Sequence, residues 1–172
     1  MTFDEFVAGR LPALLRYAAV LAGDRGLAED VTQEVLLRAH QRWAHIGGLD
    51  APEHYVRRMI TNEYLSWRRR WARVVPRAAV EPADPQPDHA GAHAERDALL
   101  GELHRLPRRQ RAVLVLRYYA GLSDQEIAAE LGCAAGTVRG YASRALATLR
   151  IELVPSDHDA RVVGRIPREE AV

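Results

Sequence analysis

The chain has 172 residues, which leaves room for one ordinary domain or two small ones. The net charge is only +1, but all 24 basic side chains are Arg. Arg can bind phosphate or guanine bidentately. A GC-rich coding bias would leave the same composition. The single cysteine, Cys133, excludes an intrachain disulfide, and neither a leader nor an apolar run of about 18 residues is visible, so we expect a soluble, cytoplasmic protein without membrane insertion.

The first predicted helix begins almost at the N-terminus. Thr2 and Glu5 have the spacing of a capping box, in which each side chain satisfies a backbone amide of the first turn. Pro12 predicts a kink or a break, because an interior proline removes one hydrogen bond and crowds the carbonyl four residues earlier. The apolar residues at helical spacing are Phe3, Phe6, Val7, Leu11, Leu14, Leu15 and Ala18.

The second predicted helix, over residues 27–46, has two distinct faces. A Leu among acids and amides is typical of a docking surface for a basic or mixed partner, but a solvated helix with one stray Leu fits equally well. The apolar face is formed by Leu27, Ala28, Val31, Val35, Ala39, Trp43 and Ile46. The opposite face carries Asp30, Gln33, Glu34, Leu37 and Gln41.

The third predicted helix, over residues 53–70, is strongly basic, and Pro52 suits its first position. Between residues 57 and 77 there are seven Arg and one acid, Glu63, interleaved with Tyr and Trp. Phosphates need positive charge and exposed bases need a stacking surface, so the pattern suits nucleic acid. The alternative is a solvated basic helix whose Trp residues belong to the core. One face carries Val56, Met59, Ile60, Tyr64 and Trp67, and the opposite face carries Arg58, Asn62, Leu65 and Arg69.

Residues 76–94 are rich in Pro, Ala, Asp and His without an apolar period, which predicts a flexible linker. We therefore expect an all-α fold of two small helical domains, at residues 1–75 and 95–153, followed by a weakly ordered tail at 154–172.

His89 and His93 lie four residues apart near Asp88, but a flexible linker cannot hold a metal site. No arrangement of catalytic side chains and no phosphate-binding loop is visible, so the chain is not expected to be an enzyme or to bind a cofactor.

The C-terminal domain has the pattern of a helix-turn-helix. Supporting helices are predicted from about residue 95 and again from Pro107 to Gly121. Ser123 and Glu126 form a second capping box, and Gly132 can end that helix after about eight residues. The next helix buries Val138, Ala142, Ala145, Leu146 and Leu149. Its other side, which carries Thr137, Arg139, Gly140, Tyr141, Ser143 and Arg144, suits the major groove, although an ordinary helical hairpin is the alternative.

Three segments together resemble regions 2 and 4 of the extracytoplasmic-function group of the sigma-70 family, in its actinobacterial SigE-like branch. The segments are GDRGLAEDVTQEVLLRAHQRW, APEHYVRRMITNEYLSWRRR and LPRRQRAVLVLRYYAGLSDQEIAAELGCAAGTVRGYASRALATLR. The resemblance covers about residues 3 to 152 and implies an RNA polymerase sigma factor that directs initiation at promoters with particular −10 and −35 elements. Its partners would be core polymerase, through the β′ clamp helices and the β flap, and promoter DNA. Anti-sigma control is common in the group, although nothing in the residues indicates it.

The resemblance also implies roles for particular residues. Core polymerase would be bound by Asp30, Gln33, Glu34 and Leu37. The −10 element would be bound by Arg58, Asn62, Trp67 and Arg69, with the loop at 45–52 receiving a flipped base. The −35 element would be bound by Gly136, Thr137, Arg139, Tyr141 and Arg144. Two departures weaken the last helix: Ala134 stands where the group often has a capping Ser, and Gly140 lies in the helix interior, each at a cost of about 1 kcal/mol.

Two other functions are compatible with parts of the sequence. A helix-turn-helix regulator that binds DNA without joining polymerase would use the same C-terminal domain, but it leaves the acidic face and the Arg and Trp helix unexplained. A small metal-dependent hydrolase would need clustered His and carboxylates, which the sequence lacks.

Overall fold

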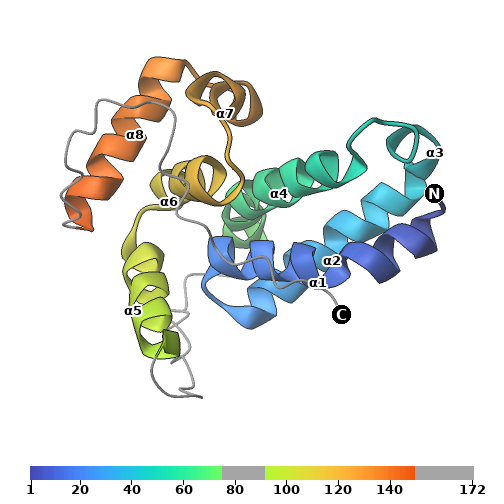
Figure 1. The fold of residues 1–172 in the computed structure, drawn as a ribbon, viewed down its shortest axis with the longest axis horizontal. Helices are drawn as coiled ribbons and strands as arrows, with labels where there is room; N and C mark the ends of the chain where they lie inside the picture. Colours follow the sequence, from blue (N-terminus) through green and yellow to red (C-terminus); the bar gives the residue numbers. More distant parts are fainter. Residues whose placement is uncertain (75–91, 150–172) are drawn as a thin grey trace. The chain divides into compact units, whose positions relative to one another are not determined.

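The computed structural model of the chain describes residues 1–74 and 92–149, without the side chains of residues 67–97. The described part consists of helices and contains no strand, which confirms the all-α prediction (Figure 1). The predicted linker, the His89 and His93 pair and the predicted tail lie outside the described residues or side chains. The chain divides into two compact units, Met1–Ala112 and Val113–Val172.

Helix α1 (Phe3–Ala22) begins at the predicted capping box. The Thr2 amide donates to the Glu5 carboxylate at 2.7 Å, and the Glu5 amide donates to the Thr2 hydroxyl at 3.2 Å. The helix continues through Pro12, so a break there is wrong. The carbonyl that loses its partner belongs to Ala8, and because Ala8 and Pro12 are both exposed, water can replace the missing hydrogen bond.

The second predicted helix is divided in two. Helix α2 (Arg25–Gln41) ends at Arg42, which has φ −115° and ψ 15°, and α3 (Trp43–Ile46) follows as a single turn. The Arg42 amide donates to the carbonyls of Ala39 and His40, which tightens the end of α2. Ile46 is nevertheless fully buried, so the apolar face continues across the break.

Helices α1, α2 and α4 (Pro52–Val74) pack against one another as the core of the first unit (Figure 1). The Tyr17 and Thr61 hydroxyls share a buried hydrogen bond of 2.7 Å that joins α1 to α4. Since a buried hydroxyl without a partner is costly, this bond favours one register of the two helices. The largest buried side chains of this core are Phe6, Leu14, Tyr17, Leu21, Val31, Val35, Ile46, Val56, Ile60 and Tyr64.

Arg111 ties the last part of the first unit to α1. Its side chain comes from α6 (Arg108–Leu114), is 7% exposed, and donates to the carbonyls of Leu21 at 2.8 Å and Ala22 at 3.2 Å. It also donates to the carbonyl of His104, near the end of α5 (Ala92–Arg105), at 2.5 Å. One guanidinium therefore satisfies carbonyls that the ends of two helices leave without intrahelical partners.

His104 packs over the end of α1. Gly23, the C-cap of α1, has φ +76°, and a Cβ there would lie 2.6 Å from the His104 ring. Burial lowers the pKa of His104, and the positive charge of Arg111 lowers it further. The imidazole Nε2 is buried without a protein partner, which also favours the neutral ring.

The second unit holds the helix-turn-helix. The end of α6 passes into one turn of π-helix, η1 (Val115–Tyr119), in which the Ala120 amide donates to the Val115 carbonyl at 3.0 Å. A single predicted helix through this region is thus interrupted before Gly121, which has φ +71°. Such π-turns are uncommon and often lie at functional sites.

Helix α7 (Asp124–Leu131) confirms the second capping box, and α8 (Ala135–Thr148) follows after a three-residue turn. The Ser123 hydroxyl and amide donate to Glu126 at 2.6 Å and 2.8 Å, and these bonds lower the pKa of the Glu126 carboxyl. Gly132 is left-handed with φ +61°, as a residue that ends a helix should be. Ala134 supplies no side-chain cap to α8, which also confirms the sequence-based expectation.

The stability of the folded chain should decrease as the pH falls through the titration range of His104. Because the pKa of His104 is lower in the folded state, the unfolded chain takes up a proton first, starting near the unperturbed value of about 6.5. The free energy of unfolding should fall from pH 8 towards pH 5 and level off below the folded pKa. Urea unfolding of wild type and His104→Asn at each pH measures the contribution of His104 to the free energy of unfolding.

The matched control is His54→Asn, which removes an exposed histidine of α4. Its pH profile should follow the wild type, whereas His104→Asn should flatten it. If His104→Asn retains the full wild-type slope, this assignment is wrong.

Restoring a cap at Ala134 should stabilise α8. Ala134 has φ −77° and ψ 148°, the extended geometry of an N-cap, so a Ser hydroxyl there can accept from the Thr137 amide. Ala134→Ser should add about 1 kcal/mol to the stability of α8, measured as slower hydrogen exchange of its first-turn amides in the full chain. The control, Ala129→Ser, places the same hydroxyl at an exposed interior position of α7. Equal protection in both variants would contradict the capping argument.

Candidate nucleic-acid and protein interfaces

The structure brings the four predicted polymerase-binding residues together on one exposed face of α2. Asp30, Gln33, Glu34 and Leu37 are all exposed, and the Leu37 side chain is 57% exposed. The opposite face of the same helix is buried through Val31 and other apolar residues. A large apolar side chain held in solvent between acids and an amide is the composition of a binding surface. We refer to these four residues as the α2 face.

An apolar groove that the sequence analysis missed adjoins the α2 face. It lies between α1 and α2, has a volume of about 470 Å³, and is lined in part by Gln33 and Leu37. The signal was present in the first helix, whose apolar residues are too many for one buried stripe. Those that line the groove are Phe3, Val7, Leu11 and Leu15, and Leu36 completes the apolar wall from α2.

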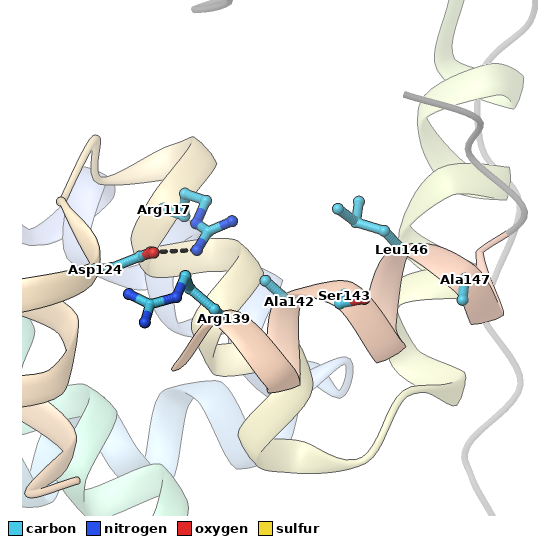
Figure 2. Close-up of a pocket in the computed structure, with 7 residues that line it drawn as sticks. All are labelled: Arg117, Asp124, Arg139, Ala142, Ser143, Leu146 and Ala147. Carbon is cyan, nitrogen blue, oxygen red and sulfur yellow. Dashed lines mark hydrogen bonds and ion pairs between the residues drawn. The ribbon is translucent and has the colours of Figure 1, made fainter. Parts of the chain in front are cut away.

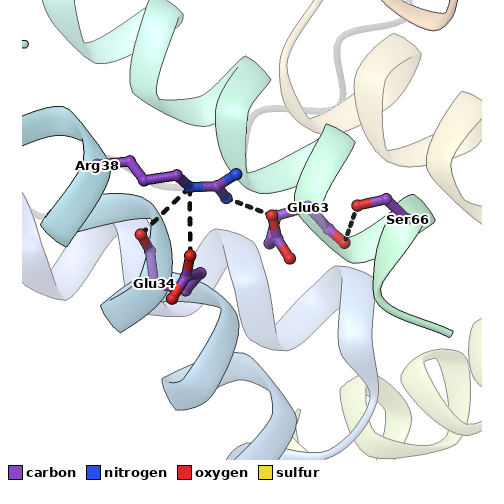
Figure 3. A network of polar contacts seen from close by, with 4 residues as sticks. All are labelled: Glu34, Arg38, Glu63 and Ser66. Atoms are coloured by element: carbon purple, nitrogen blue, oxygen red, sulfur yellow. Dashed lines mark hydrogen bonds and ion pairs between the residues drawn. The ribbon is translucent and has the colours of Figure 1, made fainter. Parts of the chain in front are cut away.

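A polar network connects the α2 face to α4 (Figure 3). The Arg38 guanidinium donates to the Glu63 carboxylate, and Glu63 is 3% exposed. The same Arg38 side chain lies 3.6 Å from the Glu34 carboxylate and donates to the Glu34 backbone carbonyl at 3.4 Å. Glu63 is buried whereas the Arg38 side chain is 36% exposed, so the loss of Arg38 would remove the cation that faces a buried carboxylate, which is costly. The sequence singled out Glu63 as the one acid of a basic stretch but could not identify its partner.

The predicted −10 residues lie on α4. Arg58 and Asn62 are exposed, one turn apart, on the side opposite the buried Val56 and Ile60. Trp67 and Arg69 belong to the same helix, but their side chains lie outside the described part of the structure. The structure therefore places two of the four side chains on one solvent-facing side.

The predicted base-receiving loop is shorter than its sequence range. His45 belongs to α3 and Pro52 begins α4, so residues 47–51 form the connection. Gly48 and Asp50 are exposed within it. The loop joins the short helix after the α2 face to the helix that carries Asn62.

The predicted −35 residues lie along α8. Gly136, Thr137, Arg139 and Arg144 are exposed, and Tyr141 is half-buried. The Arg144 guanidinium lies over the Tyr141 ring at 5.4 Å, a cation–π contact that holds this long side chain against its own helix.

Two charged residues outside α8 border the same surface. An open pocket of about 500 Å³ is lined by Arg117 of η1, Asp124 of α7, and Arg139 and Ser143 of α8 (Figure 2). Arg117 pairs with Asp124, which joins the π-turn to the first helix of the helix-turn-helix. For Arg139 no ion pair is recorded among the described side chains, which leaves its charge available. Arg117 and Asp124 were missed because a helix wheel cannot join residues of separate elements.

The described residues contain neither a metal-binding cluster nor a membrane-spanning helix. They contain no group of three or more His, Cys, Asp or Glu side chains placed to hold a metal ion. Among them, no helix is long and apolar enough to cross a membrane.

Comparisons with known proteins agree with this geometry. Residues 6–74 match the family model for sigma-70 region 2, and residues 96–149 match that for sigma-70 region 4. The chain is 41% identical to the RNA polymerase sigma-E factor of Streptomyces coelicolor over 98% of this chain and 96% of that one. It is 36% identical to the ECF RNA polymerase sigma factor SigL of Mycobacterium tuberculosis, over 88% and 86% of the two chains.

A solved structure supports the same assignment. The fold is similar to that of the sigma factor RpoE in complex with the anti-sigma factor NepR from Bartonella quintana, with a TM-score of 0.64 and 26% identity. That match covers 88% of this chain and 98% of the solved one. The chain therefore belongs to the sigma-70 family, in the extracytoplasmic-function (ECF) group of RNA polymerase sigma factors.

Proposed function

We propose that this sigma factor binds core RNA polymerase through the α2 face and recognises promoter DNA through α4 and α8. It is a promoter-specificity subunit, and its role in initiation is recruitment and positioning, not catalysis, in the cytoplasm. Residues 1–75 serve polymerase and the −10 element, and residues 95–153 serve the −35 element. The observation that carries the proposal is the exposed Leu37 between Gln33, Glu34 and Asp30 on a helix whose other side is buried.

The charges of the α2 face suit a helical, basic partner such as the β′ clamp helices. Asp30 has no ion pair among those that the described part of the structure records, so its charge is available to a partner. Among the described residues, the ion pair recorded for the Glu34 carboxylate is the longer contact to Arg38, at 3.6 Å. Leu37 supplies apolar area at the centre of the patch, where interfaces are least polar.

The DNA-binding side chains divide into two sets. Arg58 and Asn62 on α4 are placed for the −10 element, with the loop at 47–51 receiving a flipped base. Arg139, Thr137 and Gly136 near the start of α8 are placed for the major groove of the −35 element, and the β flap would hold this domain on polymerase. Weak capping of α8 indicates modest affinity for DNA alone, so attachment to polymerase supplies the second contact.

An anti-sigma factor is a further proposed partner. The structural neighbour is a sigma factor bound to one, and this chain has an apolar groove beside its polymerase-binding residues. A regulator that covered Leu37 and the groove would compete directly with core polymerase.

The reading as a DNA-binding regulator that does not join polymerase gives the α2 face no role. Such a regulator needs only its helix-turn-helix. An exposed Leu between acids on a separate helix would then have no binding partner and would only favour aggregation. The two readings are separated by measuring core binding.

Reversing the charge of the α2 face should weaken core binding. Asp30→Arg places a like charge against a basic partner, and we expect at least about a tenfold loss of affinity for purified core polymerase. Binding to −35 duplex DNA should be unchanged. Glu102→Arg on exposed α5 makes the same charge change and should retain core affinity. Equal loss of core and DNA binding by Asp30→Arg would indicate unfolding and would count against the α2 face.

Removing Arg144 should weaken −35 recognition. If its guanidinium reads a base edge, Arg144→Ala costs about 1 to 3 kcal/mol and relaxes preference at one position of the element. Competition with −35 duplexes substituted one base pair at a time measures both effects. Arg105→Ala removes an exposed Arg of α5 as the control for net charge. An unchanged base preference in Arg144→Ala would remove Arg144 from the base-reading set.

A further inference from the structure

The connection between α3 and α4 rests directly on an indole ring. A Cβ placed on Gly47 would lie 2.8 Å from Trp43 Nε1, 3.1 Å from Trp43 Cε2 and 3.0 Å from the Trp43 carbonyl oxygen. A contact of 2.8 Å essentially never occurs for a real Cβ atom, and the two longer contacts are unusually tight, so a neighbour would have to move. Gly47 has φ −65° and ψ −17°, a conformation open to every residue, so a glycine is required here by close approach to the ring.

The indole cannot easily move away from Gly47. Its ring centroid lies 5.3 Å from that of Phe3 and 4.8 Å from that of Phe6, which is 1% exposed. Its Nε1 donates to the Met1 carbonyl at 3.2 Å. The Trp43 carbonyl accepts from the Gly47 amide at 2.8 Å, so the ring and the backbone of one residue both hold the loop.

The neighbouring glycine is a natural contrast. A Cβ on Gly48 would lie 3.6 Å from the His45 carbonyl oxygen, which is an ordinary van der Waals contact. The half-buried Gly47 therefore packs against the indole, whereas the exposed Gly48 does not.

We propose that Trp43 is the positioning residue of the loop at 47–51 and, through it, of the place where that loop receives the flipped −10 base. The inference rests on the proposed function of that loop. Trp43 does not touch DNA in this account; its ring and carbonyl fix the first residue of a loop that contains two glycines. A loop already held in its bound geometry loses less conformational entropy when it takes up a base, which raises affinity and sharpens the choice of base.

The test uses holoenzyme assembled from the full chain and purified core polymerase. Binding is measured to single-stranded non-template oligonucleotides that contain the −10 element, substituted one base at a time. Wild type should prefer one base at the flipped position by about 5-fold to 150-fold, the range of a good base contact. Gly47→Ala should reduce that ratio at least about fivefold while core affinity stays close to wild type, although the clash with the indole should lower the thermal unfolding midpoint. Gly9→Ala, which adds the same methyl group to α1 with nothing within 4 Å of it, should retain the wild-type ratio.

A second variant approaches the same contact from the ring. Trp43→Phe keeps an aromatic ring against Phe3 and Phe6 but removes Nε1 and the bond to the Met1 carbonyl. It should also lower discrimination at the flipped base while leaving preference at the other −10 positions unchanged. That selectivity separates positioning of the loop from general destabilisation.

Three results would overturn the proposal. Retention of the wild-type ratio in Gly47→Ala or Trp43→Phe would show that contact with the indole does not position the loop. Equal loss in Gly47→Ala and Gly9→Ala would show that an added methyl group lowers the ratio without any contact with the indole. Wild-type holoenzyme that initiates but discriminates at no flipped position would remove the loop site. Failure of the wild-type chain to bind core polymerase is a different outcome, because it contradicts the proposed function itself.

Discussion

Tyr17 of α1 and Tyr64 of α4 are almost fully inaccessible to solvent, and the N-terminal unit depends on the packing of α1, α2 and α4 that buries such side chains. Each helix has one apolar stripe, and once three stripes share a core, the opposite sides must face solvent. The α2 face and the Arg58 and Asn62 side of α4 are consequences of the same packing. The Tyr17 to Thr61 hydrogen bond adds directional specificity to an otherwise non-directional contact.

The Arg-only composition has two different uses in the folded chain. Arg111 and Arg38 are structural: the first satisfies the carbonyls of helix ends, and the second balances a buried carboxylate. Arg58, Arg139 and Arg144 are exposed on the sides that the proposal assigns to DNA. A coding bias towards Arg would explain the absence of Lys, but it would not separate interior from DNA-facing positions in this way.

Local rules predicted the parts of the fold that local interactions determine. Both capping boxes, the left-handed Gly132 and the uncapped Ala134 follow from chemistry within four residues, and all were confirmed. Helix faces were also predictable, because period and composition together indicate which side is buried. The separation of α3 from α2 at Arg42 was not, since the apolar period continues across the break and nothing in it indicates a change of backbone conformation.

Contacts between elements far apart in sequence were beyond those rules. Arg111 of α6 donates to the carbonyl of Leu21 in α1, and Arg117 of the π-turn pairs with Asp124 of the next helix. The α1–α2 groove was missed for a similar reason: its apolar residues were assigned to the core before a second helix showed which of them remained accessible. The roles of the individual DNA-facing residues stay predictions, since they depend on a nucleic-acid partner.

In the proposed function, this one chain both joins polymerase and selects promoters. The most direct measurement is transcription in a purified system, with core polymerase present with and without the chain, on a library randomised at the −10 and −35 elements. Specific initiation should require the chain and should enrich defined sequences at both elements. Initiation that is independent of the chain, or a chain that binds the library without recruiting core polymerase, would contradict the proposed function.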